Sequence, residues 1–409
     1  MKKILFLCNK SPYPAREGGP MAMNSLIQGL LNAGHQVKVL AVNSAKYHVT
    51  EADIPDEYRK QTGIELVNID LRIKPMDAFL NLFSTKSYHV QRFISENFRE
   101  KLVAILHRQQ FDVVQLESLF MVPYVDEVRK HCKARIVLRA HNIEHLIWKR
   151  LAQQCRNPLK KYYLSHLART LERYEKNALA QVDGIAAITR KDAAFFRGIT
   201  ATPVIDLPFG VKISPVNFTE DVNGQIGFFH IGAMNWMPNE EGLRWFLNEV
   251  WPEVHLRFPQ ARFHLAGRFM PSWLVTGVQP GVEVWGEVEN ATDFVNQHQI
   301  SIVPLLSGSG IRIKIIEAMA AAKTVITTEI GAEGIHYQNE KNIFIANTKE
   351  EFLYAISRCL KQPGLHLKIG RQARQLVEQI YDQDKIAARL LLFYERLQKR
   401  TAERLSFEN

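Results

Sequence analysis

The stretch from Gln299 to Gly334 is the feature that most constrains the fold. It reads QISIVPLLSGSGIRIKIIEAMAAAKTVITTEIGAEG. A branched apolar run, Ile300 to Leu306, precedes a group of small residues and a helical pattern from Ile311 to about Ala322. A second apolar run, Thr324 to Thr328, follows. A buried strand, a glycine turn, a helix and another strand make one right-handed crossover of a parallel α/β sheet.

The chemistry of this stretch lies at its strand-to-helix turn. A helix N-terminus offers unpaired N–H groups and the positive end of a dipole, and Arg312 and Lys314 add two cations there. This arrangement indicates an anion such as the diphosphate of a nucleotide sugar. Glu317, one turn later, can accept hydrogen bonds from ribose hydroxyls. The alternative is an ordinary α/β turn with solvated charges. On a regular helix Arg312 and Lys314 lie about 200° apart, so they share a ligand only if the first turn is distorted.

The rest of the C-terminal half continues the strand-and-glycine pattern. Runs at Gln225–Ile231, Arg262–Ala266 and Val282–Trp285 each end at a glycine. A row of exposed backbone groups suits a flat base and a ribose, although it is also ordinary α/β loop construction. The candidate donor-binding residues at these ends are Asn235, Gly267, Arg268, Gly286 and Glu287.

The N-terminal half opens with a strand, Lys3 to Cys8, and a loop to Gly19. Pro20 is suited to be the first residue of a helix that reaches about Asn32. Gly18 and Gly19 then form a second candidate anion site, without the G-x-G-x-x-G pattern that would favour a nicotinamide or flavin. Helical segments separate five further predicted strands, which indicates a doubly wound parallel sheet: Gln36–Val42, Ile64–Asn68, Asp112–Leu116, Ala134–Ala140 and Gly184–Thr189.

His141 follows the predicted strand that ends at Ala140. Open α/β sheets place ligand groups at such carboxyl ends. The residue is therefore a candidate proton carrier or hydrogen-bond donor to a hydroxyl, and otherwise simply a residue at a helix start.

The length of the chain, its cysteines and its charge distribution limit the number of domains, the metal sites and the partners to be expected. A chain of 409 residues predicts two domains, with a linker over Asp206–Asn223. Four dispersed cysteines lack a C-x-x-C pair, so a zinc site is not expected. Between Arg129 and Lys176 there are 13 Lys and Arg against 3 Glu, and 13 − 3 equals the net charge of +10. Such a field favours an anionic partner, either nucleic acid, a membrane leaflet or a charged substrate, unless it is only a solvated helical face.

Several segments together carry a family resemblance. HIGAMNWMPNEEGLRWF, FHLAGR, VEVWGEVEN and GSGIRIKIIEAMAAAKTVITTEIGAEG are similar to the donor-binding half of retaining glycosyltransferases of family four, also called group 1. RAHNIEH and AQVDGIAAITRKDAAFF agree in the N-terminal half. The resemblance implies the GT-B fold: two Rossmann-like, doubly wound α/β domains that face a cleft. Residues 1–215 would form the acceptor-side domain, with a final helix, 382–409, packing back on it, and residues 216–381 the donor domain.

The resemblance also implies roles at the diphosphate. Arg312 and Lys314 would neutralise it as it leaves, and His141 would lie near the donor sugar and the acceptor. No cofactor and no metal would be required, because the cations replace one.

Further contacts to the donor are implied as well. Glu317 would hold the ribose, the backbone of Gly310 and Ile311 would contact sugar or phosphate, and Gly18 and Gly19 would approach from the other domain. Ser309 stands where many family members carry a first motif glutamate.

The expected function is transfer of a sugar, with retention, from a nucleotide-sugar donor to a saccharide or lipid-linked acceptor in surface polysaccharide or glycolipid synthesis. The alternatives are a nucleotide-sugar epimerase of the same architecture and a non-catalytic GT-B-like binding module. The expected partners include an anionic membrane surface, bound through Arg129–Lys176. Nucleic acid is not an expected partner. The protein would be cytoplasmic, peripheral at the inner face of the cell membrane.

Overall fold

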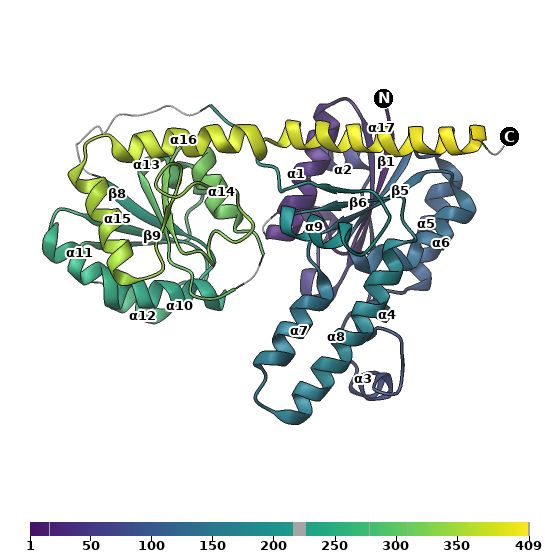
Figure 1. Ribbon diagram of the computed structural model, residues 1–409, viewed down its shortest axis with the longest axis horizontal. Helices are drawn as coiled ribbons and strands as arrows, with labels where there is room; N and C mark the ends of the chain where they lie inside the picture. The colour runs from purple at the N-terminus through teal and green to yellow at the C-terminus, as the bar shows by residue number, and fades with distance from the viewer. Residues whose placement is uncertain (16, 216–225, 278, 309, 408–409) are drawn as a thin grey trace. The chain divides into compact units, whose positions relative to one another are not determined.

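The chain folds into two α/β units (Figure 1). The computed structural model describes residues 1–15, 17–215, 226–277, 279–308 and 310–407. Unit 1 comprises Met1–Gly210 with Gln383–Asn409, and unit 2 comprises Val211–Asp382. The expected linker, Asp206–Asn223, lies partly outside the described residues, and its first residue ends a strand that the sequence did not predict, β7 (Val204–Asp206).

Unit 1 is built on a seven-stranded parallel sheet in the order β3-β2-β1-β4-β5-β6-β7. The order reverses between β1 and β4, and this is where an open α/β sheet forms its ligand crevice, at the carboxyl ends of the strands. The predicted strands are present within a few residues: β1 (Lys3–Cys8), β2 (Gln36–Asn43), β3 (Glu65–Asn68), β4 (Val113–Glu117), β5 (Arg135–Ala140) and β6 (Gly184–Ala187).

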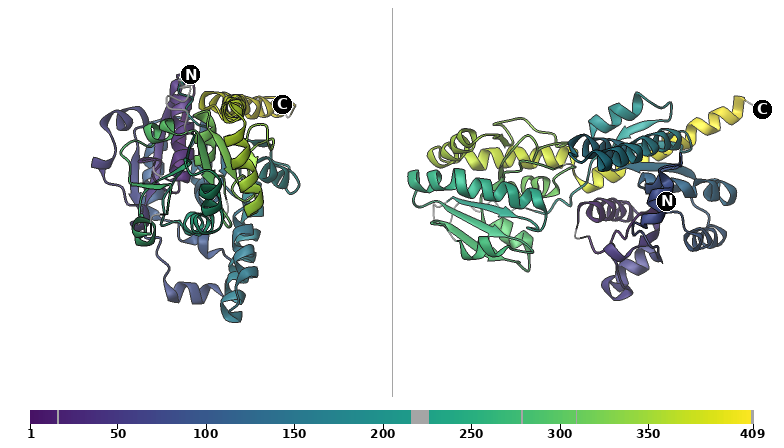
Figure 2. Two further views of the ribbon diagram at one scale, coloured as in Figure 1. Left: turned by 90° about the vertical axis from the view of Figure 1, so that its left-hand side faces the viewer. Right: turned by 90° about the horizontal axis from the view of Figure 1, so that it is seen from below.

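Helices cover both faces of this sheet. On one face α1 (Gly18–Asn32) packs beside the last helix, α17 (Gln383–Phe407), whose Leu390 and Tyr394 are fully buried. The other helical segments are α2 (Asp56–Thr62), α3 (Pro75–Asn81), α4 (Tyr88–Gln91), α5 (Glu96–Arg108), α6 (Val125–His131), α7 (Glu144–Gln154), α8 (Pro158–Leu179) and α9 (Arg190–Arg197), with short 3-10 turns at Ala45–Tyr47, Glu51–Asp53 and Leu119–Tyr124. Figures 1 and 2 show α7 and α8 projecting from the body of unit 1 as a hairpin.

Unit 2 contains a six-stranded parallel sheet in the order β10-β9-β8-β11-β12-β13, which reverses between β8 and β11. Its strands are β8 (Gly227–Ile231), β9 (Arg262–Ala266), β10 (Val282–Gly286), β11 (Ile300–Val303), β12 (Thr324–Thr327) and β13 (Phe344–Ile345). Its helices are α10 (Met237–Trp245), continued by a π-helical turn (Phe246–Val250), then α11 (Trp251–Arg257), α12 (Ser272–Thr276), α13 (Ala291–Gln297), α14 (Ile313–Ala320), α15 (Lys349–Lys361) and α16 (Leu365–Ile380).

The predicted fold class, two doubly wound α/β units, is confirmed. Strands buried on both faces explain the continuous apolar runs in the sequence, since Ile4 through Cys8 have no exposed surface. Among the described residues, none of the helices combines the length and the apolar character that a membrane span requires.

Candidate active site

The turn between β11 and α14 differs from its predicted form in where the helix begins. Helix α14 starts at Ile313, not Ile311, and Arg312 is its N-cap, with φ −89° and ψ 91°. Gly308 and Gly310 have φ of 119° and 87°, a region that favours glycine, and this keeps the loop out of the helix. Arg312 therefore escapes the helical spacing that separates it from Lys314. Ser309 lies outside the described residues.

Arg312 folds back over its own loop. Its guanidinium donates to the carbonyl of Gly310 and lies 5.2 Å from the centre of the Trp236 ring. Only 5% of the residue is exposed. A Cβ on Gly308 would come within 2.8 Å of Arg312 Nη2, so this glycine makes room for the guanidinium. Burial lowers the pKa of Arg312 from its ordinary value, but the side chain of an arginine stays protonated.

Lys314 is held by two neutral groups. Its Nζ donates to Asn239 Oδ1 at 2.7 Å and to His230 Nε2 at 3.2 Å. His230 is fully buried at the end of β8, and its Nδ1 donates to the carbonyl of Ile302 in β11 at 2.7 Å. Because burial and the nearby Lys314 hold the pKa of His230 well below its ordinary value, the ring is neutral and its Nε2 accepts.

The surroundings of Lys314 make its charge costly. Burial, and then the neighbouring Arg312, lower the pKa of Lys314 to about 7. Sequence reasoning missed His230 and Asn239, although a histidine within the apolar run GFFHI was a signal. The β8–β11 switch point thus brings together a half-neutral lysine and a buried arginine.

Glu317 lies one turn into α14. The residue remains exposed, yet burial of its carboxyl raises the pKa above the ordinary value. Among the interactions found for the described residues, none engages this carboxylate. Its predicted role, accepting hydrogen bonds from a ribose, stays a prediction.

The glycines at the ends of β8, β9 and β10 have a structural explanation. Gly267 N donates to Gly286 O at 2.7 Å, and Gly232 N donates to the carbonyl of Ala266 at 3.1 Å, so the strand ends stay paired. Gly267 has φ 148°, and a Cβ there would lie 1.8 Å from Gly232 O. The close approach of these two backbone segments is therefore sufficient to explain the glycine at position 267, without a ligand. Gly286, with φ 71°, borders open space, because a Cβ added there would meet nothing within 4 Å.

The polar candidates beyond these glycines are exposed. Arg268 pairs with Glu287, its Nε lying 3.2 Å from Oε1. Asn235 is exposed in the loop before α10, next to Trp236. Nothing among the described contacts links Arg268 or Glu287 to Arg312 or Lys314.

In unit 1, His141 does follow β5, and its partner is a glutamate that the sequence did not reveal. His141 Nε2 lies 2.9 Å from Oε2 of Glu117, the fully buried last residue of β4. β4 and β5 are neighbours in the sheet, so their carboxyl ends bring the two side chains together. The available signal was one charged residue that closes the apolar strand DVVQLE.

Glu117 belongs to a network of buried polar side chains. Arg139 is fully buried, with its Nε 3.9 Å from Glu117 Oε2. Gln115 donates to Glu117 at 3.2 Å and accepts from Tyr394 of α17 at 2.7 Å. Burial alone would raise the pKa of Glu117, but the hydrogen bond from His141 and the charge of Arg139 lower it.

The ionised Glu117 fixes the imidazole of His141. Because a carboxylate only accepts, Nε2 of His141 carries the proton in this hydrogen bond. In the neutral ring, Nδ1 is then the acceptor. His141 can thus accept a hydrogen bond or a proton from a hydroxyl.

The glycine pair of unit 1 lies within α1 and not before it. Helix α1 begins at Gly18, so Pro20 is its third residue and not the predicted first. A Cβ on Gly19 would meet Lys10 Cε at 2.9 Å, so the glycine lets the Lys10 side chain cross the start of the helix. Lys10 itself lies 3.8 Å from Glu17 and over the ring of Tyr47.

Part of the C-terminal half is similar to a known protein family. Residues 225–362 match the family described as Glycosyl transferases group 1. An "Uncharacterized 44.6 kDa protein in cps region" of Klebsiella pneumoniae is 22% identical over 94% of this chain and 98% of its own length.

Solved structures share the two-unit fold. Sucrose-phosphate synthase from Thermosynechococcus elongatus has a TM-score of 0.67 at 15% identity, covering 98% of this chain and all of that one (100%). HepE from Anabaena, in complex with UDP, has a TM-score of 0.66 at 15% identity, covering 96% and 100%. The solved structures confirm the expected GT-B fold. The family match over residues 225–362 agrees with the expected glycosyltransferase class.

No group of three or more His, Cys, Asp or Glu side chains within the described ranges could hold a metal ion.

Proposed function

We propose that this chain, a glycosyltransferase whose residues 225–362 form a group 1 domain, binds the diphosphate of its nucleotide-sugar donor at Arg312 and Lys314. The observation that carries the proposal is the environment of Lys314, a lysine held by two neutral groups beside a second cation, with its pKa lowered to about 7. Two neighbouring cations favour an anionic ligand such as a diphosphate. HepE, which has the same fold, was solved with UDP and with UDP-glucose.

The proposed reaction uses these charges on the leaving group. The bond between the anomeric carbon and the diphosphate oxygen breaks, negative charge develops on that oxygen, and Arg312 and Lys314 stabilise it. Glu317 holds the ribose hydroxyls. His141, oriented by Glu117, offers Nδ1 to a hydroxyl group of the acceptor.

Retention at the anomeric carbon and independence of metal are parts of the proposal. NMR of the anomeric proton in the first product formed tests retention. Activity that is unchanged in excess EDTA would support charge neutralisation by Arg312 and Lys314, whereas complete loss that Mg²⁺ restores would contradict it.

The proposed acceptor is a saccharide or lipid-linked saccharide at the cytoplasmic face of a membrane, in surface polysaccharide synthesis. The relative in a cps region supports this context. Not all of the basic segment 129–176 can face a membrane, because Arg139 is buried and Arg129 and Arg135 pair with Asp183. The exposed cations are concentrated on the α7–α8 hairpin, at Lys149, Arg150, Arg156, Lys160 and Lys161.

Thermal unfolding with UDP, GDP, ADP and TDP tests the donor site. One nucleotide at 100 times its Kd should stabilise the protein by about 2.7 kcal/mol. Lys314→Met should lose most of this gain. Lys323→Met is the matched control, because Lys323 is a half-buried lysine that bonds the carbonyl of Asn296 instead. Absence of stabilisation by all four nucleotides would overturn the proposal.

A further inference from the structure

Helix α3 and its flanks expose an unusual number of large apolar side chains. Phe83 is 79% exposed, and the rings of Phe79 and Phe83 pack edge to face with their centres 5.7 Å apart. We call this surface the apolar ridge: Ile73, Met76, Phe79, Leu80 and Phe83. Single exposed apolar residues are normal on a protein surface, but a contiguous group within one short segment marks an interaction site.

The α7–α8 hairpin lies next to the apolar ridge. His166 of α8 bonds the carbonyl of Asn81 at 2.9 Å, and His89 of α4 stacks on Trp148 of α7 at 4.0 Å. Figures 1 and 2 show α3 and the hairpin at the same end of unit 1. The start of α8 adds the exposed Leu159, flanked by cations at Arg156, Lys160 and Lys161.

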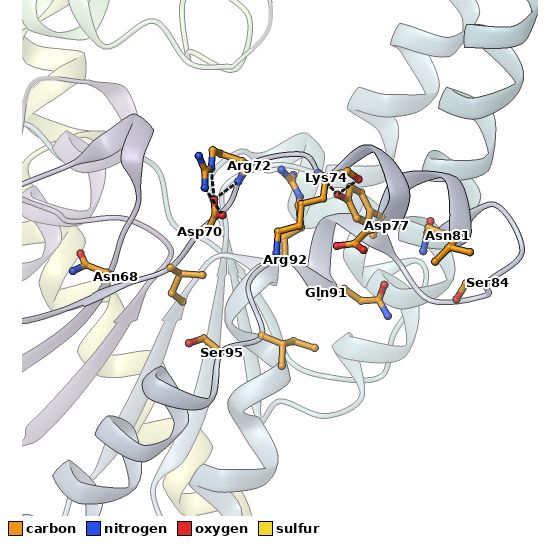
Figure 3. A pocket seen from close by; sticks show the side chains of 14 residues that line it. Asn68, Asp70, Arg72, Lys74, Asp77, Asn81, Ser84, Gln91, Arg92 and Ser95 are labelled. Carbon is orange, nitrogen blue, oxygen red and sulfur yellow. Dashed lines mark hydrogen bonds and ion pairs between the residues drawn. The ribbon is translucent and has the colours of Figure 1, made fainter.

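A pocket of about 540 Å³ lies beside the ridge, between the loop after β3, α3 and α4 (Figure 3). Arg72, Lys74 and Arg92 line it, against the two carboxylates of Asp70 and Asp77. Asp70 is taken up by an ion pair with Arg72 at 2.9 Å. The pocket therefore offers an excess of positive charge.

Two of the lining side chains are held in place while keeping polar atoms without partners. Arg92 donates to the carbonyl of Leu71 at 2.7 Å and stacks over Tyr88, yet its buried Nε has no partner among the described residues. Asn81 is 4% exposed and donates to the carbonyl of Lys86, while its buried Oδ1 likewise has none there. One orphan donor and one orphan acceptor fit a ligand that carries both an anionic group and hydroxyls.

We propose that this end of unit 1 docks on an anionic phospholipid bilayer, with the apolar ridge at the acyl boundary and one lipid phosphate in the pocket. Lys74 and Arg92 bind the phosphate, and Asn81 accepts from a headgroup hydroxyl. The occupant is a lipid because apolar side chains are interleaved with cations, the pattern of an element that lies in a membrane interface. This inference rests on the membrane location proposed above and names the surface that would contact the lipid. It does not depend on the donor site.

Cosedimentation with vesicles tests this surface. The vesicles are phosphatidylcholine alone or phosphatidylcholine with phosphatidylglycerol at about 7:3, a composition with a negative surface potential. We expect the wild-type protein to partition at least about tenfold more strongly into the anionic vesicles. Phe79→Ser with Phe83→Ser should weaken that binding by about tenfold or more, since both side chains lose apolar burial.

Two more variants test whether binding to vesicles depends on the positive charge of the pocket and on the position of the exposed apolar side chains. Lys74→Gln should weaken binding to anionic vesicles about fivefold. Leu256→Ser removes an equally exposed side chain, 79%, from α11 of unit 2 and should leave binding unchanged. Equal binding to both vesicle types, or undiminished binding of the double phenylalanine variant, would overturn the proposal.

Two controls identify the ligand source and the state of the donor site. Inorganic phosphate at the lipid-phosphate concentration should not displace the protein from vesicles; displacement would show a free-phosphate site and overturn the bilayer assignment. Thermal stabilisation by nucleotide should persist in all the surface variants. A wild-type protein that binds nucleotide but no vesicles would refute the lipid surface and leave the donor site standing.

Discussion

Binding of a nucleotide sugar should draw a proton from solution through Lys314. In the free protein the pKa of Lys314 is lowered to about 7 by burial and by Arg312. A diphosphate beside Nζ favours the charged form and so raises this pKa. A base whose pKa rises on binding takes up a proton at every pH between the free and the bound value.

The magnitude follows from the geometry of a contact. One phosphate charge at about 4 Å from Nζ, at an effective dielectric constant of about 20, contributes about 4 kcal/mol. At 1.36 kcal/mol per unit this raises the pKa of Lys314 by about 3, to about 10. At pH 8 about a tenth of the free protein carries the proton and nearly all of the complex does, so uptake is about 0.9 proton. Affinity should fall about tenfold per pH unit between pH 8 and pH 9.

Isothermal titration calorimetry at pH 8 measures the uptake directly. UDP-glucose, or the nucleotide sugar whose nucleotide stabilises the protein, is titrated in buffers of high and low ionisation enthalpy, such as Tris and phosphate. The difference in measured heat gives the number of protons bound. Lys314→Met should abolish the uptake and Lys323→Met should preserve it. Tight binding with an uptake below about 0.2 proton would refute the assignment of Lys314 to the diphosphate.

Three other predictions concern carboxyl groups. Glu117→Gln should lower the free energy of unfolding by about 3–5 kcal/mol in chemical denaturation, because it leaves the buried charge of Arg139 without its partner. Adding Arg139→Met to this variant should recover part of the lost stability, and additive losses would contradict the prediction. Burial and then Glu175 raise the pKa of Glu144 to about 7, so ionisation of Glu144 lowers the stability of the fold as pH rises from about 4.5 to 7. Glu144→Gln should therefore raise Tm at pH 8 and leave it unchanged at pH 4. Glu317→Gln should weaken nucleotide binding about tenfold or more with little change in Tm, since the substitution keeps the shape of the side chain. Equal affinity would exclude a ribose contact.

The elements of this chain were predictable because its strands are buried on both faces. Such strands appear as unbroken apolar runs, and β1 and β9 begin and end at the predicted residues. Helix starts were less predictable. α14 begins two residues after Ile311, because Gly308 and Gly310 have positive φ angles. α1 begins two residues before Pro20, at a glycine pair against which the Lys10 side chain packs.

The site was predictable where its residues are close in sequence and not where they are distant. Arg312, Lys314 and Glu317 share one crossover, so one motif contained them. His230 and Asn239 meet Lys314 only because β8 and β11 are neighbours at the switch point. Pairing across strands is set by the topology of the sheet, which no local pattern records.

The basic segment 129–176 shows why a charge count does not identify a surface. The count treats every cation as exposed, whereas Arg139 lies in the core beside Glu117. The same segment passes from the sheet edge that carries His141 into the α7–α8 hairpin. At the root of the hairpin, Glu175 of α8 accepts from the backbone N–H of Glu144 at 3.0 Å, which ties the hairpin to the residues that follow His141. A lipid surface bound at the hairpin and the apolar ridge would therefore act on α7, which begins at Glu144, three residues after the candidate catalytic histidine. Membrane docking and binding of the acceptor would then depend on the same segment of the chain.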